Sequence, residues 1–162
     1  MTVDVKKLYR EIANDEGKVL HCYLCSESHK TVGIGHRVLE TDEEQALEVY
    51  GAYDKVPDDQ SITEHRCYVL FEQDVQIALS GCMGIYSNWD ELPQNLQHIL
   101  INMAFQLGQR GLSKFKKMNL AIERKNYVEA AVEMMDSRWA TQTPERATRL
   151  QHRMLALEPV SN

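Results

Sequence analysis

The sequence predicts an α+β fold in which a small antiparallel sheet near the N-terminus is followed mainly by helices. Three observations support this prediction. Strand-forming residues and glycines are concentrated in residues 18–36, apolar residues recur at helical spacing around that segment, and capping boxes open the later helices. The 162 residues contain no internal repeat and are enough for a single domain over 1–162.

The N-terminal elements are a helix and a small sheet. Residues 3–13 carry apolar side chains at helical spacing, and Asn14-Asp15 with Gly17 then break the pattern. Residues 18–36 are rich in strand formers interrupted by Ser26-Glu27-Ser28 and by glycines. This pattern predicts a hairpin or a three-stranded antiparallel sheet.

The rest of the chain is predicted to be helical. Thr41-Asp42-Glu43-Glu44 fits a capping box for a helix that ends at Gly51. Ser61-Ile62-Thr63-Glu64 is a second capping box, which opens a run of about twenty residues to Ser80-Gly81. A run of that length in a small protein often links two lobes. Short helices are expected over 85–158, separated by Pro93, Gly108, Gly111 and Pro144.

The composition excludes several classes of protein. Hydrophobic residues make up 43% and charged residues 26% of the chain, which favours a packed core over disorder. The formal net charge of -6 argues against a nucleic-acid partner. Residues 1–81 hold 8 basic and 16 acidic side chains, whereas residues 82–162 hold 10 basic and 8 acidic. The basic residues of the second half include a stretch from Arg110 to Lys125.

No apolar run approaches the roughly 18–20 residues of a membrane span, and the first residues lack the features of a signal peptide. We therefore expect synthesis in the cytoplasm and no stable membrane insertion. Free thiols are expected in a reducing compartment for the four cysteines, Cys22, Cys25, Cys67 and Cys82. The Cys22-x-x-Cys25 pair has no matching second pair, so neither a metal site nor a cofactor is predicted.

Glu16 stands at an unusual place for a carboxylate, where the first helix stops and the sheet begins. One interpretation is a solvated acid in a turn. The other is a general acid in a cleft between sheet and helices, where partial burial would raise its pKa and keep a proton available.

Several motifs resemble the T-even phage-type lysozymes (glycoside hydrolase family 24), and they occur in that family's order and spacing. They are Asp15-Glu16-Gly17, Thr31-Val32-Gly33-Ile34-Gly35-His36, the segment 101–108, Tyr127-Val128-Glu129-Ala130-Ala131, Ser137-Arg138-Trp139 and the segment 142–147. The resemblance implies a lysozyme-like fold, with an N-terminal α+β lobe over 14–65 and a helical C-terminal lobe over 1–13 and 66–162. The connecting helix would span about 61–81, and peptidoglycan would bind between the lobes.

The implied reaction is hydrolysis of the β-1,4 bond between N-acetylmuramic acid and N-acetylglucosamine. The resemblance assigns the general acid to Glu16 and a further catalytic role to Thr31. Where the family has a catalytic Asp, six residues before that Thr, this chain has Cys25. An ordinary thiol is mostly protonated at neutral pH. Cys25 is therefore a base, a nucleophile or an inert side chain, and Glu27 is a further source of a carboxylate.

Other residues take their expected roles from the same resemblance. His36 and Asp74 match an ion pair that stabilises the fold, and Arg146 matches an Arg that faces the catalytic Glu. Phe105 and Gln106 match positions on the cleft floor that contact sugar. The resemblance further implies a monomeric phage endolysin that collects in the host cytoplasm and reaches the wall after a holin opens the membrane. The alternatives are a catalytically weak wall-binding module and a lytic transglycosylase that uses Glu16 alone.

Overall fold

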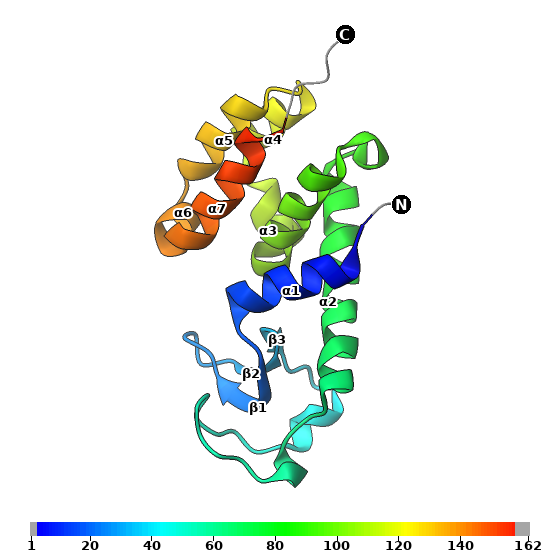
Figure 1. Cartoon of the computed structure of the whole chain (residues 1–162), viewed down its shortest axis with the longest axis vertical. Coiled ribbons are helices and arrows are strands. Elements are labelled where there is room, and N and C mark those ends of the chain that lie inside the picture. The colour runs from blue at the N-terminus through cyan, green and yellow to red at the C-terminus, as the bar shows by residue number, and fades with distance from the viewer. Residues whose placement is uncertain (1–2, 158–162) are drawn as a thin grey trace. The chain divides into compact units, whose positions relative to one another are not determined.

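The computed structural model describes residues 3–157, in which seven α-helices accompany three strands (Figure 1). The N-terminal elements are α1 (Val5–Glu16), β1 (Val19–Leu24), β2 (Lys30–Gly33), β3 (His36–Arg37) and the short 3₁₀-helices η1 (Glu43–Ala46) and η2 (Asp58–Gln60). They are followed by α2 (Glu64–Ile85), η3 (Trp89–Glu91), α3 (Gln94–Ser113), α4 (Lys116–Glu123), α5 (Tyr127–Met135), α6 (Arg138–Gln142) and α7 (Pro144–Leu155). The predicted α+β class is confirmed.

Helix α1 carries the first candidate catalytic residue at its C-terminal end. Asp4 caps its start, because its carboxylate accepts a hydrogen bond from the backbone N–H of Lys7 at 3.0 Å. The helix runs past the predicted stop at residue 13 and ends at Glu16. Gly17 ends it with a φ of 79°, and its N–H donates to the carbonyl of Ala13 at 2.8 Å.

The three strands form one antiparallel sheet in the order β1-β2-β3, as the sequence predicted. Tyr23 lies opposite Thr31 and Leu24 opposite Lys30 between the first two strands. The buried side of this region packs on α1 and α2 through apolar side chains, which include Leu8, Ile12, Val32, Ile34, Leu70 and Phe71. The rings of Tyr9 and Phe71 lie 5.2 Å apart in an edge-to-face arrangement.

The predicted helix from Thr41 to Gly51 is wrong, because only the 3₁₀-turn η1 forms there. Acidic side chains of the predicted capping box form hydrogen bonds and ion pairs with other residues instead of capping a helix. Asp42 accepts hydrogen bonds from His36 and from the backbone of Leu39, and the buried Glu44 forms a two-pronged ion pair with Arg66 at 2.8 and 2.9 Å. Beyond η1 the chain is extended, and Tyr50 N–H donates to the carbonyl of Cys22.

Helix α2 begins close to its predicted position but ends later. The hydroxyl of Thr63 accepts a hydrogen bond from Arg66 N–H at 3.0 Å, so Thr63 rather than Ser61 caps the helix. The helix continues four residues past Gly81, its predicted end, to Ile85. Gly81 permits close packing instead, because a Cβ atom there would lie 3.0 Å from the Cβ of Gln109 on α3.

The C-terminal half is helical, as predicted. Most of the first half of α3 is buried, and the helix is kinked where Gly108 adopts a φ of 72°. The side chain of Ser137 caps α6, and Pro144 occupies the first turn of α7. Helix α5 packs against both α4 and α7.

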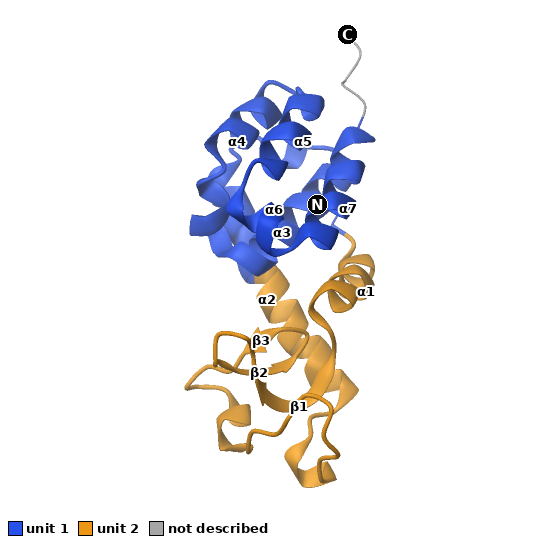
Figure 2. Ribbon diagram, turned by 90° about the vertical axis from the view of Figure 1, so that its left-hand side faces the viewer, with its two compact units in different colours: residues 1–3, 77–162 blue, residues 4–76 orange. Residues whose placement is uncertain are grey.

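The chain divides into two compact units, with the boundary inside α2 (Figure 2). We call Asp4–Gln76 the sheet unit, and Met1–Val3 with Ile77–Asn162 the helical unit. The sequence analysis instead grouped residues 1–13 with 66–162. Helix α1 belongs with the sheet because Tyr9 packs on both Tyr68 and Phe71 in the first half of α2. Among the described residues, no helix combines the length and apolarity needed to cross a membrane.

Candidate active site

The side chain of Glu16 lies against Gly35 in the sheet unit. Gly35 joins β2 to β3 with a φ of 62°, a conformation that glycine adopts readily. A Cβ atom on residue 35 would lie 3.0 Å from Oε2 and 3.3 Å from Cβ of Glu16. The glycine therefore leaves the space that the partly buried carboxylate occupies. Both the turn and the acid require glycine at this position.

Replacement of Gly35 by Ala is expected to displace the Glu16 carboxylate. We expect a fall in kcat of about 100-fold, because small errors in the placement of a catalytic group have effects of that size. Gly108→Ala is the matched control, since its φ of 72° is also positive and its added Cβ has no atom within 4 Å, but it lies on α3 and not next to Glu16. Equal activity of the two variants in a peptidoglycan-release assay would contradict this role of Gly35.

Cys25 lies where the β1–β2 hairpin turns. Its backbone N–H donates to the carbonyl of His29 at 3.0 Å, which continues the pairing of Tyr23 with Thr31. Since side chains alternate along a strand and opposite residues share a face, Tyr23, Cys25 and Thr31 lie on one face of the hairpin. Cys22 lies on the other face and is fully buried. The four cysteines are free thiols among residues 3–157.

The surroundings of Cys25 favour its ionised form. The backbone amides of His29 and Glu27 lower the pKa of the thiol, an effect that Thr31 reinforces and partial burial opposes. The Thr31 hydroxyl itself donates a hydrogen bond to the carbonyl of His29 at 2.8 Å. The other three cysteines behave in the opposite way. Burial raises the pKa of Cys22 and Cys67, and raises that of Cys82 to about 12. Cys25 is thus chemically distinct within the chain.

Tyr23 connects the two candidate catalytic groups, and the sequence analysis missed it. Burial raises the pKa of its phenol, and the negative charges of Glu16 and Cys25 raise it further. The acid at the end of α1 and the thiol at the end of β1 therefore lie in the same neighbourhood of the sheet unit. The signal in the sequence was the position of Tyr23, two residues before Cys25 on a predicted strand, which gives the two side chains a common face.

His36 lies between two carboxylates. Its Nδ1 is 2.7 Å from Oδ2 of Asp74, the expected partner, and its Nε2 is 2.7 Å from Oδ2 of Asp42, which the sequence analysis did not identify. Burial alone would lower the pKa of His36, but the hydrogen bonds and charges of the two aspartates outweigh it and raise the pKa. These contacts fix β3 to α2 and to the loop before η1, which supports the hairpin carrying Thr31.

Stability should depend on pH through His36. The pKa of His36 is higher in the folded than in the unfolded protein. Its contribution to the free energy of unfolding is therefore complete below the unfolded pKa of about 6.5 and is lost as the pH rises through the folded pKa. Asp74→Asn removes one charge-assisted hydrogen bond, so we expect a loss of about 1.5–3 kcal/mol in the free energy of unfolding at about pH 6. The measurement is urea denaturation between about pH 6 and pH 9, where the variant should lose less stability than wild type. The exposed Asp90→Asn is the control, and a decline in Asp74→Asn as steep as that in wild type would contradict this account.

The remaining candidate residues belong to the helical unit. Phe105 is partly buried on α3, and Gln106 accepts a hydrogen bond from Trp139 Nε1 at 2.8 Å. Arg146 is buried, and its guanidinium donates to the side chain of Asn102 at 2.8 Å and to its backbone carbonyl at 3.2 Å. Its expected action on Glu16 stays a prediction.

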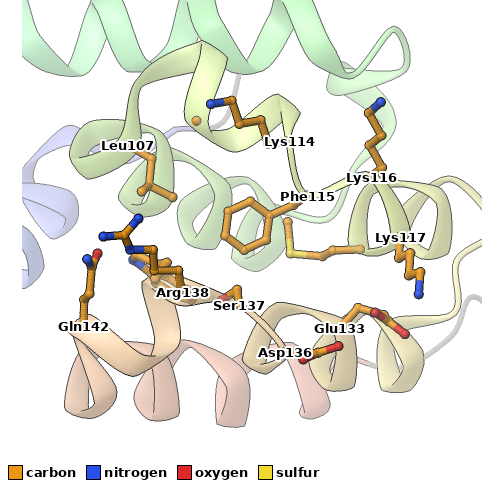
Figure 3. Close-up of a pocket in the computed structure, with 13 residues that line it drawn as sticks. Leu107, Lys114, Phe115, Lys116, Lys117, Glu133, Asp136, Ser137, Arg138 and Gln142 are labelled. Carbon is orange, nitrogen blue, oxygen red and sulfur yellow. The ribbon is translucent and has the colours of Figure 1, made fainter.

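A pocket of about 620 Å³ lies within the helical unit (Figure 3). Phe115 and Trp139 form part of its apolar lining, with ring centroids 6.0 Å apart and close to perpendicular. Charges of both signs also line it, contributed by Lys114, Lys116, Lys117, Arg138, Glu133 and Asp136. Trp139 lines the pocket and donates a hydrogen bond to Gln106. The Gln106 amide, which is predicted to contact sugar, therefore lies next to the pocket. Residues 3–157 contain no cluster of three or more side chains suited to a metal ion.

Comparison with known proteins gives consistent similarities. A model of the phage lysozyme family matches residues 13–156. The chain is 34% identical over 159 residues to "Probable T4-type lysozyme 2" of Dictyostelium discoideum, covering 90% of this chain and 92% of that protein. It is 34% identical over 150 residues to "Probable T4-type lysozyme 1" of the same organism. It also matches the "Pre-baseplate central spike protein Gp5" of Enterobacteria phage T4, at 29% identity over 86% of this chain and 26% of that protein.

Proposed function

Since the chain belongs to the phage lysozyme family and is an enzyme of the lysozyme class, we propose that it hydrolyses the β-1,4 bond between N-acetylmuramic acid and N-acetylglucosamine in bacterial peptidoglycan. The observation that carries this proposal is the position of Glu16, whose carboxylate lies against Gly35 at the turn that follows the strand of Thr31. A positioned acid and an opposing anionic group are the two parts that glycoside hydrolysis requires.

Glu16 donates its proton to the glycosidic oxygen as the bond from that oxygen to the anomeric carbon breaks. The thiolate of Cys25 then completes the reaction by one of two routes. As a base, it takes a proton from water while that water attacks the anomeric carbon, and the configuration is inverted. As a nucleophile, it attacks the anomeric carbon itself, and water later hydrolyses the thioglycosyl bond with retention of configuration. Thr31 shares the face of Cys25, and its hydroxyl donates to the carbonyl of His29 at 2.8 Å, which holds the hairpin in place beside the sulfur.

The environment of Cys25 favours hydrolysis over the two alternatives. A lytic transglycosylase needs only one acid–base carboxylate, so it has no use for an anion held beside that carboxylate. A binding module likewise has no use for a stabilised thiolate. In this chain the backbone amides of His29 and Glu27, together with Thr31, lower the pKa of Cys25. That arrangement supports a reacting group.

The helical unit would supply further contacts to the wall polymer. Phe105 and Gln106 would contact sugar, and the adjoining pocket would receive a polar part of the polymer. The stem peptides of peptidoglycan carry both carboxylates and amino groups. The pocket offers lysines and acids together, which suits such a ligand.

The biological role that we propose is that of a phage endolysin, a monomer that stays in the host cytoplasm until a holin opens the membrane. Its support is the match to the phage lysozyme family. Expression in bacteria tests the role, because cells should lyse only after a pore-forming agent permeabilises the membrane. Lysis on expression alone would contradict dependence on a holin.

The activity is tested by digestion of purified peptidoglycan and mass spectrometry of the soluble products. Hydrolysis at the proposed bond gives reducing N-acetylmuramic acid ends. Anhydro-muramic ends would instead identify a lytic transglycosylase, and reducing N-acetylglucosamine ends would identify cleavage of the other glycosidic bond. Tight binding to the wall without soluble products would identify a binding module.

A further inference from the structure

Tyr23 lies on the face of the hairpin that carries Cys25 and Thr31. It is the residue of β1 that pairs with Thr31, so the two side chains share a face of the hairpin. Cys25 follows two residues later in the chain and shares that face. Tyr23 is thus flanked, on the same surface, by both hairpin residues of the candidate site.

The third member of the candidate site also acts on Tyr23. Glu16 comes from a different element, the end of α1, yet its charge reaches the phenol together with that of Cys25. In the proposed reaction, Glu16 faces the glycosidic oxygen and Cys25 faces the anomeric carbon bonded to it. A side chain close to both groups therefore lies alongside the bond between those atoms.

Tyr23 has the chemistry for such a position. Its side chain is only partly buried, so part of the ring remains open to a ligand. Burial raises the pKa of the phenol, which keeps the hydroxyl protonated and able to donate a hydrogen bond across the neutral range. An aromatic ring with a polar tip suits a sugar, which presents both C–H faces and hydroxyl groups.

We infer that Tyr23 is a substrate-contacting residue, whose ring and hydroxyl bind the sugar at the bond being cleaved. This inference rests on the proposed function. Loss of the hydroxyl alone should remove one hydrogen bond to the sugar, whereas loss of the ring should also open the thiol of Cys25 to water. Leu24 is the matched control, since it is the next residue on β1, points to the opposite face and is 55% exposed.

The test compares Tyr23→Phe, Tyr23→Leu and Leu24→Ala. Tyr23→Phe should lower kcat/KM on peptidoglycan fragments about 3- to 10-fold, mainly through KM, with an unchanged unfolding temperature. Tyr23→Leu should lose more activity. In Tyr23→Leu, alkylation of Cys25 by iodoacetamide should also reach half its maximal rate at a lower pH, because the thiolate becomes better solvated. Leu24→Ala should match wild type in all three measurements.

Wild-type kcat/KM in both Tyr23 variants, with Glu16→Gln inactive, would overturn the inference while the proposed function stands. Should wild type release no products, the proposed function fails and the alkylation measurement decides where Tyr23 lies. An unchanged alkylation profile in Tyr23→Leu would then overturn its placement beside the thiol.

Discussion

Glu16→Gln is expected to lower kcat on peptidoglycan by about 1,000-fold, within the range of about 10²–10⁴ that a positioned proton donor contributes. The amide has nearly the same shape as the acid, so it can still lie against Gly35, but it has no proton to give to the glycosidic oxygen. The measurement is the initial rate of product release, together with the unfolding temperature. A change in stability is not expected, because Gln continues α1 as well as Glu does.

Glu40→Gln is the control for this prediction, since Glu40 is an exposed carboxylate of the same unit. It should retain the wild-type rate. Substantial activity in Glu16→Gln, combined with a normal fold, would show that the proton donor lies elsewhere. The account of the site around Gly35 and Tyr23 would then be wrong.

Replacement of Cys25 should have the second largest effect on activity. The size of the loss should depend on whether the new side chain is ionised. Cys25→Ala and Cys25→Ser are expected to lose activity by about 100-fold or more, because neither side chain ionises near neutral pH. Cys25→Asp should retain activity within about tenfold of wild type, since its carboxylate is ionised under the same conditions. The pH profile should separate the two active enzymes, with Cys25→Asp working at lower pH than wild type.

Glu27→Gln tests the remaining source of a carboxylate near the hairpin. The Glu27 side chain is 79% exposed and lies 3.9 Å from the imidazole of His29, so we expect this variant to keep the wild-type rate. Full activity in Cys25→Ser would show that the thiol is dispensable. Loss of activity in Glu27→Gln with full activity in Cys25→Ala would move the role to Glu27.

The parts of the fold that depend on local signals were predictable. Gly17 after α1, the strand formers of 18–36 and Pro144 all act through neighbours in the sequence, whereas the caps Asp4 and Thr63 were not identified. The absence of an α-helix after Thr41 was not predictable, because the acidic residues there bind partners distant in the chain. Arg66, which pairs with Glu44, is 22 residues away.

The same distinction applies to the candidate site. Glu16 was marked by its place before Gly17, and Cys25 and Thr31 by their spacing. Tyr23 and Asp42 were missed because their importance comes from contacts formed only in three dimensions. Tyr23 meets a charge from the end of α1, and Asp42 meets an imidazole that already binds Asp74. Likewise, no spacing rule indicates that the backbone amides of His29 and Glu27 lower the pKa of Cys25.

The central claim is that the ionised thiol of Cys25 takes the place of a catalytic carboxylate. The most direct measurement modifies that thiol with methyl methanethiosulfonate, which converts it to a small methyl disulfide (Cys–S–S–CH₃) with loss of methanesulfinate. Modification is followed by mass spectrometry and activity by product release. The other three cysteines are fully buried, so Cys25 should react first. We predict that activity falls in proportion to modification of Cys25 and returns when a reductant removes the group. Full activity of the completely modified protein would contradict the claim.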